Sequence, residues 1–85
     1  MILKVTAFYR GDLPDLLKAV EQALKNYRVK LYGRSILVYS SPVTPFEALL
    51  RLGENGSLEI YVDKVEFLDA LLGIDGIELK DIEAF

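Results

Sequence analysis

Carboxylate pairs are the residues of this sequence whose types and spacing could support acid–base chemistry or divalent-cation binding. The three pairs are Asp12 with Asp15, Asp63 with Glu66, and Asp81 with Glu83. The first two stand where helices are predicted to begin, and carboxylates at such positions accept hydrogen bonds from free backbone amides. The third pair would share the solvated face of a strand. Because the spacing suggests no third ligand for a cation, we expect no metal, no cofactor and no catalytic residue.

The composition lacks the side chains on which most enzymes depend. The 85 residues include no cysteine and no histidine, so a thiolate nucleophile and the commonest general base and metal ligand are missing. The sequence has neither a Gly-x-Gly-x-x-Gly pattern nor a Walker loop, and we interpret GIDG, residues 73–76, as a turn. We therefore expect a protein that is not an enzyme.

Cations and aromatic rings alternate between residues 27 and 39, as they do on surfaces that bind single-stranded nucleic acid. The cations of this candidate contact are Arg28, Lys30 and Arg34. The net charge of −3 argues against nucleic acid as a partner, because proteins that bind it usually carry a basic excess. We favour a solvated strand edge for this segment.

A candidate ligand loop precedes Pro45 and carries the hydroxyl groups of Ser40, Ser41 and Thr44. The residues Thr44-Pro45-Phe46-Glu47 have the pattern of a capping box and predict a short helix over 45–52. Hydroxyls and free amides at a helix start could hold a carboxylate or a phosphate. The simpler interpretation is a turn followed by a helix cap.

Periodic patterns predict the elements that position these groups. Apolar residues recur at helical spacing over 12–27 and 65–72. Alternation predicts strands over 2–9, 30–40, 57–63 and 77–84. For 30–40 we favour one long strand with a bulge over a hairpin that turns at Gly33-Arg34. With the helix over 45–52, the order is βαβαβαβ in a single domain, residues 1–85.

Two fold classes fit this order of elements. We favour an α+β fold, a small ferredoxin-like βαββαβ sandwich with the helix 45–52 as an extra element between the second and third strands. The alternative is a mixed or parallel α/β sheet. Residues 57–63 alternate cleanly, whereas strands buried on both faces of a parallel sheet read as continuous apolar runs. Residues 65–85, VEFLDALLGIDGIELKDIEAF, resemble the final helix–strand unit of ACT-type and other ferredoxin-like modules.

The sheet face left uncovered by the helices 12–27 and 65–72 is predicted to bind another protein. Its residues are Ile2, Phe8, Tyr32, Ile36, Val38 and Tyr61, joined by Phe46 and Leu50 if the helix 45–52 folds over them. So large an apolar patch typically marks an interaction site. We predict a non-enzymatic interaction module, either a homodimer or a subunit of a larger complex. A small-ligand sensing domain of the ACT-like kind is the alternative, and nucleic-acid binding ranks below both.

The charges are divided between the two halves of the sequence. Residues 1–34 carry seven Lys and Arg against three Asp and Glu, a balance of +4, and residues 35–85 carry three against ten, a balance of −7. These halves can attract each other within one fold or between two copies. No stretch approaches the run of about 18 apolar residues that spans a bilayer, so we expect no membrane contact and a cytoplasmic location. The few amides and the absence of cysteine match a thermophilic, archaeal-type composition.

Overall fold

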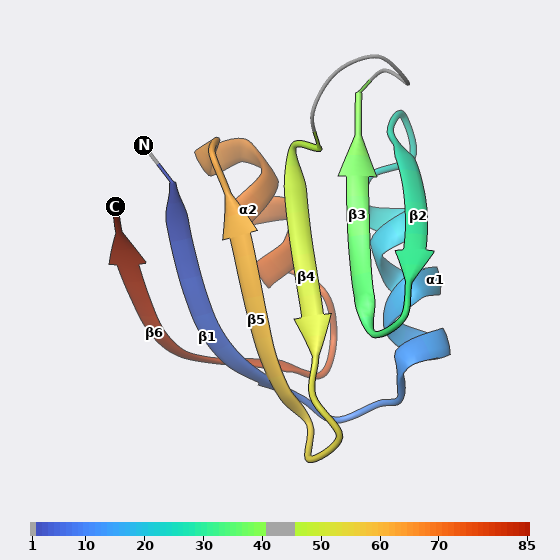
Figure 1. Cartoon of the computed structure of the whole chain (residues 1–85), viewed down its shortest axis with the longest axis vertical. Coiled ribbons are helices and arrows are strands. Elements are labelled where there is room, and N and C mark those ends of the chain that lie inside the picture. Colours follow the sequence, from blue (N-terminus) through green and yellow to red (C-terminus); the bar gives the residue numbers. More distant parts are fainter. Residues whose placement is uncertain (1, 41–45) are drawn as a thin grey trace.

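The computed structural model describes residues 2–40 and 46–85, which form six strands and two helices. In chain order these are β1 (Leu3–Tyr9), α1 (Leu13–Ala23), β2 (Arg28–Tyr32), β3 (Ser35–Tyr39), β4 (Ala48–Leu52), β5 (Ser57–Val62), α2 (Val65–Leu72) and β6 (Ile77–Ala84). The strands make one sheet in the order β2-β3-β4-β5-β1-β6 (Figure 1). Every neighbouring pair is antiparallel.

The predicted ferredoxin-like βαββαβ sandwich with an inserted helix is wrong. The described residues form a six-stranded antiparallel sheet with two helices, and the strands contain more residues than the helices. The mixed or parallel sheet is also wrong, because each described strand pair is antiparallel. Two segments account for the difference, namely residues 45–52 and residues 30–40.

Strand β4 occupies most of the segment that was predicted to be a helix. Leu50 pairs with Ile36 of β3 on one side and with Ile60 of β5 on the other. Alanine and leucine favour helices, but a short segment between two strands gains hydrogen bonds on both sides and buries alternate side chains, which outweighs local propensity. The predicted helix start falls partly outside the described residues, because Thr44 and Pro45 are not among them.

Strands β2 and β3 form a hairpin in place of the single long strand that was favoured. Tyr32 pairs with Ser35, so Gly33 and Arg34 make a two-residue turn. Gly33 has a φ of 58°, which agrees with the first loop position of a type II′ turn. The guanidinium of Arg34 fastens this turn to β4, because its Nε donates to the carbonyl oxygen of Leu52 at 2.6 Å. The alternative prediction of a hairpin is confirmed.

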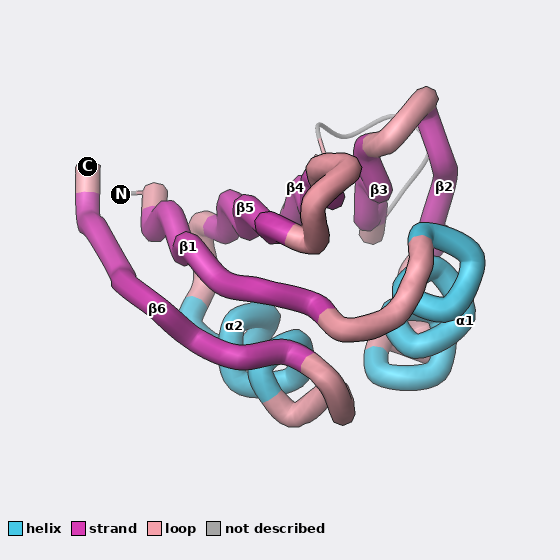
Figure 2. Tube along the Cα trace, turned by 90° about the horizontal axis from the view of Figure 1, so that it is seen from below, coloured by secondary structure: helices cyan, strands magenta, loops and turns pink. Residues whose placement is uncertain are grey.

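Both helices lie against one face of the sheet (Figure 2). The predictions of helices over 12–27 and 65–72 are confirmed, although α1 already ends at Ala23. Tyr27, which follows α1, and Phe67 of α2 meet edge to face, with ring centroids 4.9 Å apart. The core between sheet and helices includes Val5, Ala7, Leu16, Val20, Ile36, Val38, Leu50, Leu58, Ile60, Phe67, Leu68 and Leu71. Among the described residues, neither helix has the length and apolar character needed to cross a membrane.

A capping box between Asp12 and Asp15 holds the start of α1. The backbone N–H of Asp15 donates to Oδ1 of Asp12 at 3.1 Å, and the N–H of Asp12 donates to Oδ2 of Asp15 at 3.5 Å. These bonds, with the backbone N–H of Asp15 as the largest cause, lower the pKa of Asp12 from its ordinary 3.8. Because its pKa is depressed on folding, Asp12 stabilises the fold above pH 3.8, and this stabilisation is lost as the pH falls through the folded-state pKa.

We expect Asp12→Ala to lower the melting temperature at about neutral pH, and to lower it progressively less below about pH 4 as the wild-type carboxylate is protonated. Thermal unfolding followed by circular dichroism across this range measures the difference. Glu21→Ala is the matched control, because Glu21 is an exposed carboxylate in the last turn of α1, at the end away from the capping box. A difference between Asp12→Ala and wild type that does not change with pH would contradict a role for the charge.

Candidate functional site

The sheet face opposite the helices, named here the open face, is the candidate functional site. Strand register places Lys4 of β1 beside Tyr61 of β5, and Tyr61 in turn beside Leu49 of β4. No described helix covers this face (Figure 2). Its large exposed side chains are Ile2 (50% exposed), Phe8 (42%), Tyr32 (56%) and Phe46 (48%). The open face therefore offers apolar contact area to solvent.

Three residues predicted for this face lie in the core instead. Ile36, Val38 and Leu50 are fully buried. Ile36 pairs with Leu50 in the register of β3 and β4, and both side chains face the helices. The open-face positions of β3 are Ser35, Leu37 and Tyr39. Alternation could not single out Leu37 and Tyr39, because the four residues 36–39 are all apolar or aromatic. Ile2, Phe8, Tyr32, Tyr61 and Phe46 lie outside the core.

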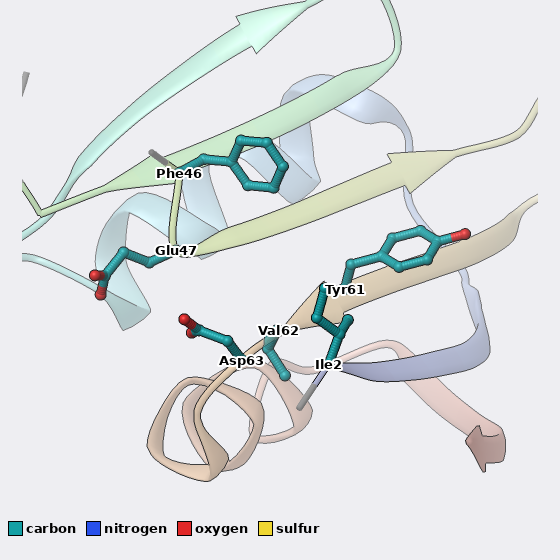
Figure 3. Close-up of a pocket in the computed structure, with 6 residues that line it drawn as sticks. All are labelled: Ile2, Phe46, Glu47, Tyr61, Val62 and Asp63. Atoms are coloured by element: carbon teal, nitrogen blue, oxygen red, sulfur yellow. The ribbon is translucent and has the colours of Figure 1, made fainter. Parts of the chain in front are cut away.

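A hollow of about 200 Å³ opens at one end of the open face (Figure 3). Ile2, Phe46 and Tyr61 supply apolar walls, and Glu47 and Asp63 supply carboxylates. Figure 3 shows these two carboxylates at the end away from the Tyr61 hydroxyl. Sites for drug-sized ligands measure about 300–1,000 Å³, so the hollow has room for a single side chain. Its lining suits an apolar group that carries a positive charge.

Glu47 is already engaged at the rim of this hollow. Its carboxylate accepts a hydrogen bond from Oγ of Ser40 at 3.3 Å, and Nζ of Lys64 lies 3.8 Å from the same carboxylate. The Lys64 side chain is half exposed, so this ion pair contributes little to stability. A cation that enters the hollow would therefore compete with Lys64 for Glu47.

A polar triad of Lys4, Glu59 and Tyr61 occupies the middle of the open face. Nζ of Lys4 lies 3.5 Å from Oε2 of Glu59 and 5.9 Å from the centre of the Tyr61 ring, and the Tyr61 hydroxyl donates to Oε2 of Glu59 at 3.4 Å. The phenol of Tyr61 and the carboxylate of Glu59 raise the pKa of Lys4 above 10.5 and outweigh the opposing effect of burial. A lysine that stays protonated at neutral pH is neither a nucleophile nor a general base, which suits Lys4 to a contact surface.

Opposite ends of the sheet carry opposite charges. Exposed Arg28 and Lys30 belong to the edge strand β2, and exposed Asp81 and Glu83 belong to the other edge strand, β6. Strands β3, β4, β5 and β1 separate the two edges. The basic and acidic edges therefore cannot neutralise each other within one copy, and both remain available to a partner.

The structure does not bring the candidate nucleic-acid contacts together. Arg28 and Lys30 are exposed on β2, whereas Arg34 binds the carbonyl oxygens of Leu52 and Gly53 at the hairpin turn. A guanidinium held in this way serves the fold. Nucleic-acid binding therefore loses one of its three predicted cations.

The candidate ligand loop loses its predicted support, because the described segment after it is a strand and provides no helix start. Ser41 and Thr44 lie outside the described residues. Ser40 is described, and its hydroxyl donates to Glu47. An anion could therefore not use the predicted helix amides there.

The carboxylate pairs have separate outcomes. The capping role of Asp12 and Asp15 is confirmed, whereas α2 has Lys64 as its cap residue without a side-chain hydrogen bond, so the predicted cap at Asp63 is wrong. Within residues 2–40 and 46–85, no group of three or more carboxylates is arranged to hold a metal ion.

No protein-family model, curated protein or solved structure matches this chain. The open face and the sheet edges are therefore the features that bear on its function.

Proposed function

We propose that the protein is a non-enzymatic interaction module that associates with a second copy of itself through the open face. The observation that carries this proposal is the uncovered sheet face, on which Ile2, Phe8, Tyr32 and Phe46 are each at least 42% exposed. Apolar patches of this kind on small proteins commonly mark interaction surfaces. Burial of these side chains against another sheet face would supply the main driving force for association.

The charge distribution supports a second copy as the partner. If two open faces stack about a two-fold axis parallel to the strands, β2 of each copy lies over β6 of the other. Arg28 and Lys30 then approach Asp81 and Glu83, whose positions on the opposite edges are given by the strand order. Such an isologous contact is self-complementary and closes as a dimer, and aligned sheets stack at about −30°.

A cytoplasmic location belongs to the same proposal. It is supported by the composition, because a chain without cysteine cannot gain stability from the disulfides that form in oxidising compartments. The described residues form a hydrophobic core and a fully paired set of strands without any disulfide.

We expect the double variant Phe8→Ser/Phe46→Ser to weaken association by at least about tenfold, because it removes two exposed rings from the proposed contact. Light scattering after size exclusion, over a range of protein concentrations, measures the dimer fraction. Val65→Ser is the matched control, because Val65 is 59% exposed on α2 and lies on the helix side of the sheet. Raised salt should also weaken the dimer, since it screens the exposed charges.

Two results would contradict the proposal. One is a wild-type chain that stays monomeric over the whole concentration range. The other is a double variant that dimerises as strongly as Val65→Ser. Circular dichroism of each variant shows whether the fold is intact, as expected for substitutions at side chains this exposed.

A further inference from the structure

We propose that the two edge strands bind each other between copies, so that β2 of one copy adds to β6 of the next and extends the sheet. This contact uses backbone groups at the edges of the sheet, which the open-face contact does not use, and it shares with that contact only the charged side chains of β2 and β6. The argument depends on which residues direct their backbone groups outward, on strand direction, and on the charges at the two edges.

On β6, Ile82 and Ala84 direct their backbone groups away from the sheet. Ile2 and Phe85 exchange backbone hydrogen bonds. The nitrogen of Ile2 lies 3.2 Å from the carbonyl oxygen of Phe85, and the nitrogen of Phe85 lies 2.9 Å from the carbonyl oxygen of Ile2. Residue pairs along an antiparallel ladder alternate between hydrogen-bonded and non-hydrogen-bonded. Glu83, two residues before Phe85, therefore also bonds to β1, whereas Ala84 and Ile82 do not. The backbone N–H of Ile82 instead donates to its neighbour Asp81, at Oδ1, over 2.9 Å.

On β2, Val29 and Leu31 direct their backbone groups outward. The two-residue turn makes Tyr32 and Ser35 the closing pair of the hairpin, and such a pair exchanges hydrogen bonds. Lys30, two residues earlier, therefore also bonds to β3. On both edge strands, the residues with outward backbone groups are the ones whose side chains lie on the helix side of the sheet.

The directions of the two edges suit antiparallel pairing. Five successive antiparallel pairings separate β2 from β6, so these strands run in opposite directions within one copy. Two copies placed side by side therefore bring β2 and β6 together in antiparallel orientation. The pairing continues the pattern that the rest of the sheet already follows.

One register matches both charge and apolar character. If Val29 lies opposite Ile82, then Arg28 lies opposite Glu83 and Lys30 lies opposite Asp81, with all four charged side chains on the open-face side. Cross-strand pairs of opposite charge stabilise a sheet. On the helix side, the contact covers exposed apolar side chains of both edges, namely Leu31 (43% exposed) and Ile82 (44%).

Pairing between identical edges is disfavoured by the same charges. Two paired β6 strands would place the carboxylates of Asp81 and Glu83 opposite each other. Two paired β2 strands would place the cations of Arg28 and Lys30 opposite each other. Like charges directly opposite are destabilising.

The β6 register shifts between Thr6 and Ala7 of β1, and a bulge of this kind ends regular pairing along an edge, so the contact is confined to the last residues of β6.

The contact is heterologous, because different surfaces of the two copies meet. Such contacts extend into open chains unless rotation closes them into rings. We therefore expect assemblies that grow with protein concentration and shrink with added salt.

Proline variants test this pairing, because proline removes a backbone N–H and tolerates only an outward-facing position on an edge strand. Val29→Pro blocks β2, and Ile82→Pro blocks β6. Both are made in the Phe8→Ser/Phe46→Ser background, so that loss of the open-face contact and loss of the edge contact are separated. Light scattering after size exclusion measures the mass of each variant alone and of their equimolar mixture.

We expect each proline variant alone to be monomeric and the mixture to form a one-to-one dimer. The mixture joins the intact β6 of the first variant to the intact β2 of the second and cannot extend further. A parent background that forms no assemblies would overturn the proposal, as would a mixture that stays monomeric. Association of Val29→Pro alone would indicate β6 pairing with β6, and association of Ile82→Pro alone would indicate β2 pairing with β2, which also overturns it.

A second set of variants covers the case in which proline prevents folding. Lys30→Glu and Asp81→Lys each place like charges opposite each other in the proposed register, so each alone should assemble less than the parent background. Their mixture restores opposite charges at every contact and should recover assembly. Failure of the mixture to exceed the single variants would contradict the register.

Discussion

Replacing Leu50 by alanine is expected to lower the free energy of unfolding by about 2–5 kcal/mol, the range for a fully buried leucine truncated in a core. Leu50 has no exposed surface and pairs with Ile36 and Ile60 in neighbouring strands. Leu49, the next residue, is partly exposed on the open face, so Leu49→Ala should cost less than half as much. Urea denaturation followed by circular dichroism, with the slope compared between variants, measures both.

The contrast between these neighbours tests β4 directly. In a helix over 45–52, Leu49 and Leu50 would lie on adjacent parts of one apolar face and contribute about equally. In a strand, successive side chains point to opposite faces of the sheet. Equal losses for Leu49→Ala and Leu50→Ala would contradict the strand and favour the helix.

Gly56→Ala is expected to lower the free energy of unfolding by about 2 kcal/mol or more, because it combines backbone strain with a close contact. Gly56 has a φ of 86°, and a Cβ atom there would lie 3.1 Å from the carbonyl oxygen of Tyr9. The backbone N–H of Tyr9 also donates to the carbonyl oxygen of Gly56 at 2.9 Å. The added methyl group would therefore push apart the end of β1 and the turn before β5.

Gly33→Ala is the matched control, because it tests positive φ without crowding. Gly33 has a φ of 58°, and a Cβ atom there would meet no atom within 4 Å. We expect Gly33→Ala to lower the free energy of unfolding by about 1–2 kcal/mol, from conformational strain alone. Urea denaturation compares the two variants, and a loss for Gly33→Ala as large as that for Gly56→Ala would mean that the contact with Tyr9 contributes nothing.

Elements decided by nearby residues were predictable from the sequence. Helix α1 begins where Asp12 and Asp15 bond to each other's backbone, over a span of three residues, and such a cap is visible in the sequence. Strand β5 alternates apolar and polar residues because one of its faces is buried and the other is only partly covered. Strand β6 and helix α2 were also predicted, although the cap residue of α2 is Lys64 and not Asp63.

The fold class was not predictable from the same patterns. Residues 48–52 are rich in alanine and leucine, and their apolar positions fit a short helix as well as a strand. Strand β4 forms because β3 and β5 provide hydrogen-bonding partners on both sides, and this pairing involves residues distant in the chain. The hairpin at Gly33 was weighed only as an alternative, because glycine there also fits a bulge.

The candidate site divides in the same way. The sequence by itself determined the exposed aromatic residues, the absence of cysteine and histidine, and the opposite charges of its two halves. Only the tertiary structure decided that Ile36 and Val38 face the core while Leu37 and Tyr39 face outward, because strand register chooses between two apolar sets. The tertiary structure also placed the basic β2 and the acidic β6 at opposite edges of the sheet. Local sequence patterns do not encode this order, because it depends on pairing between strands distant in the chain.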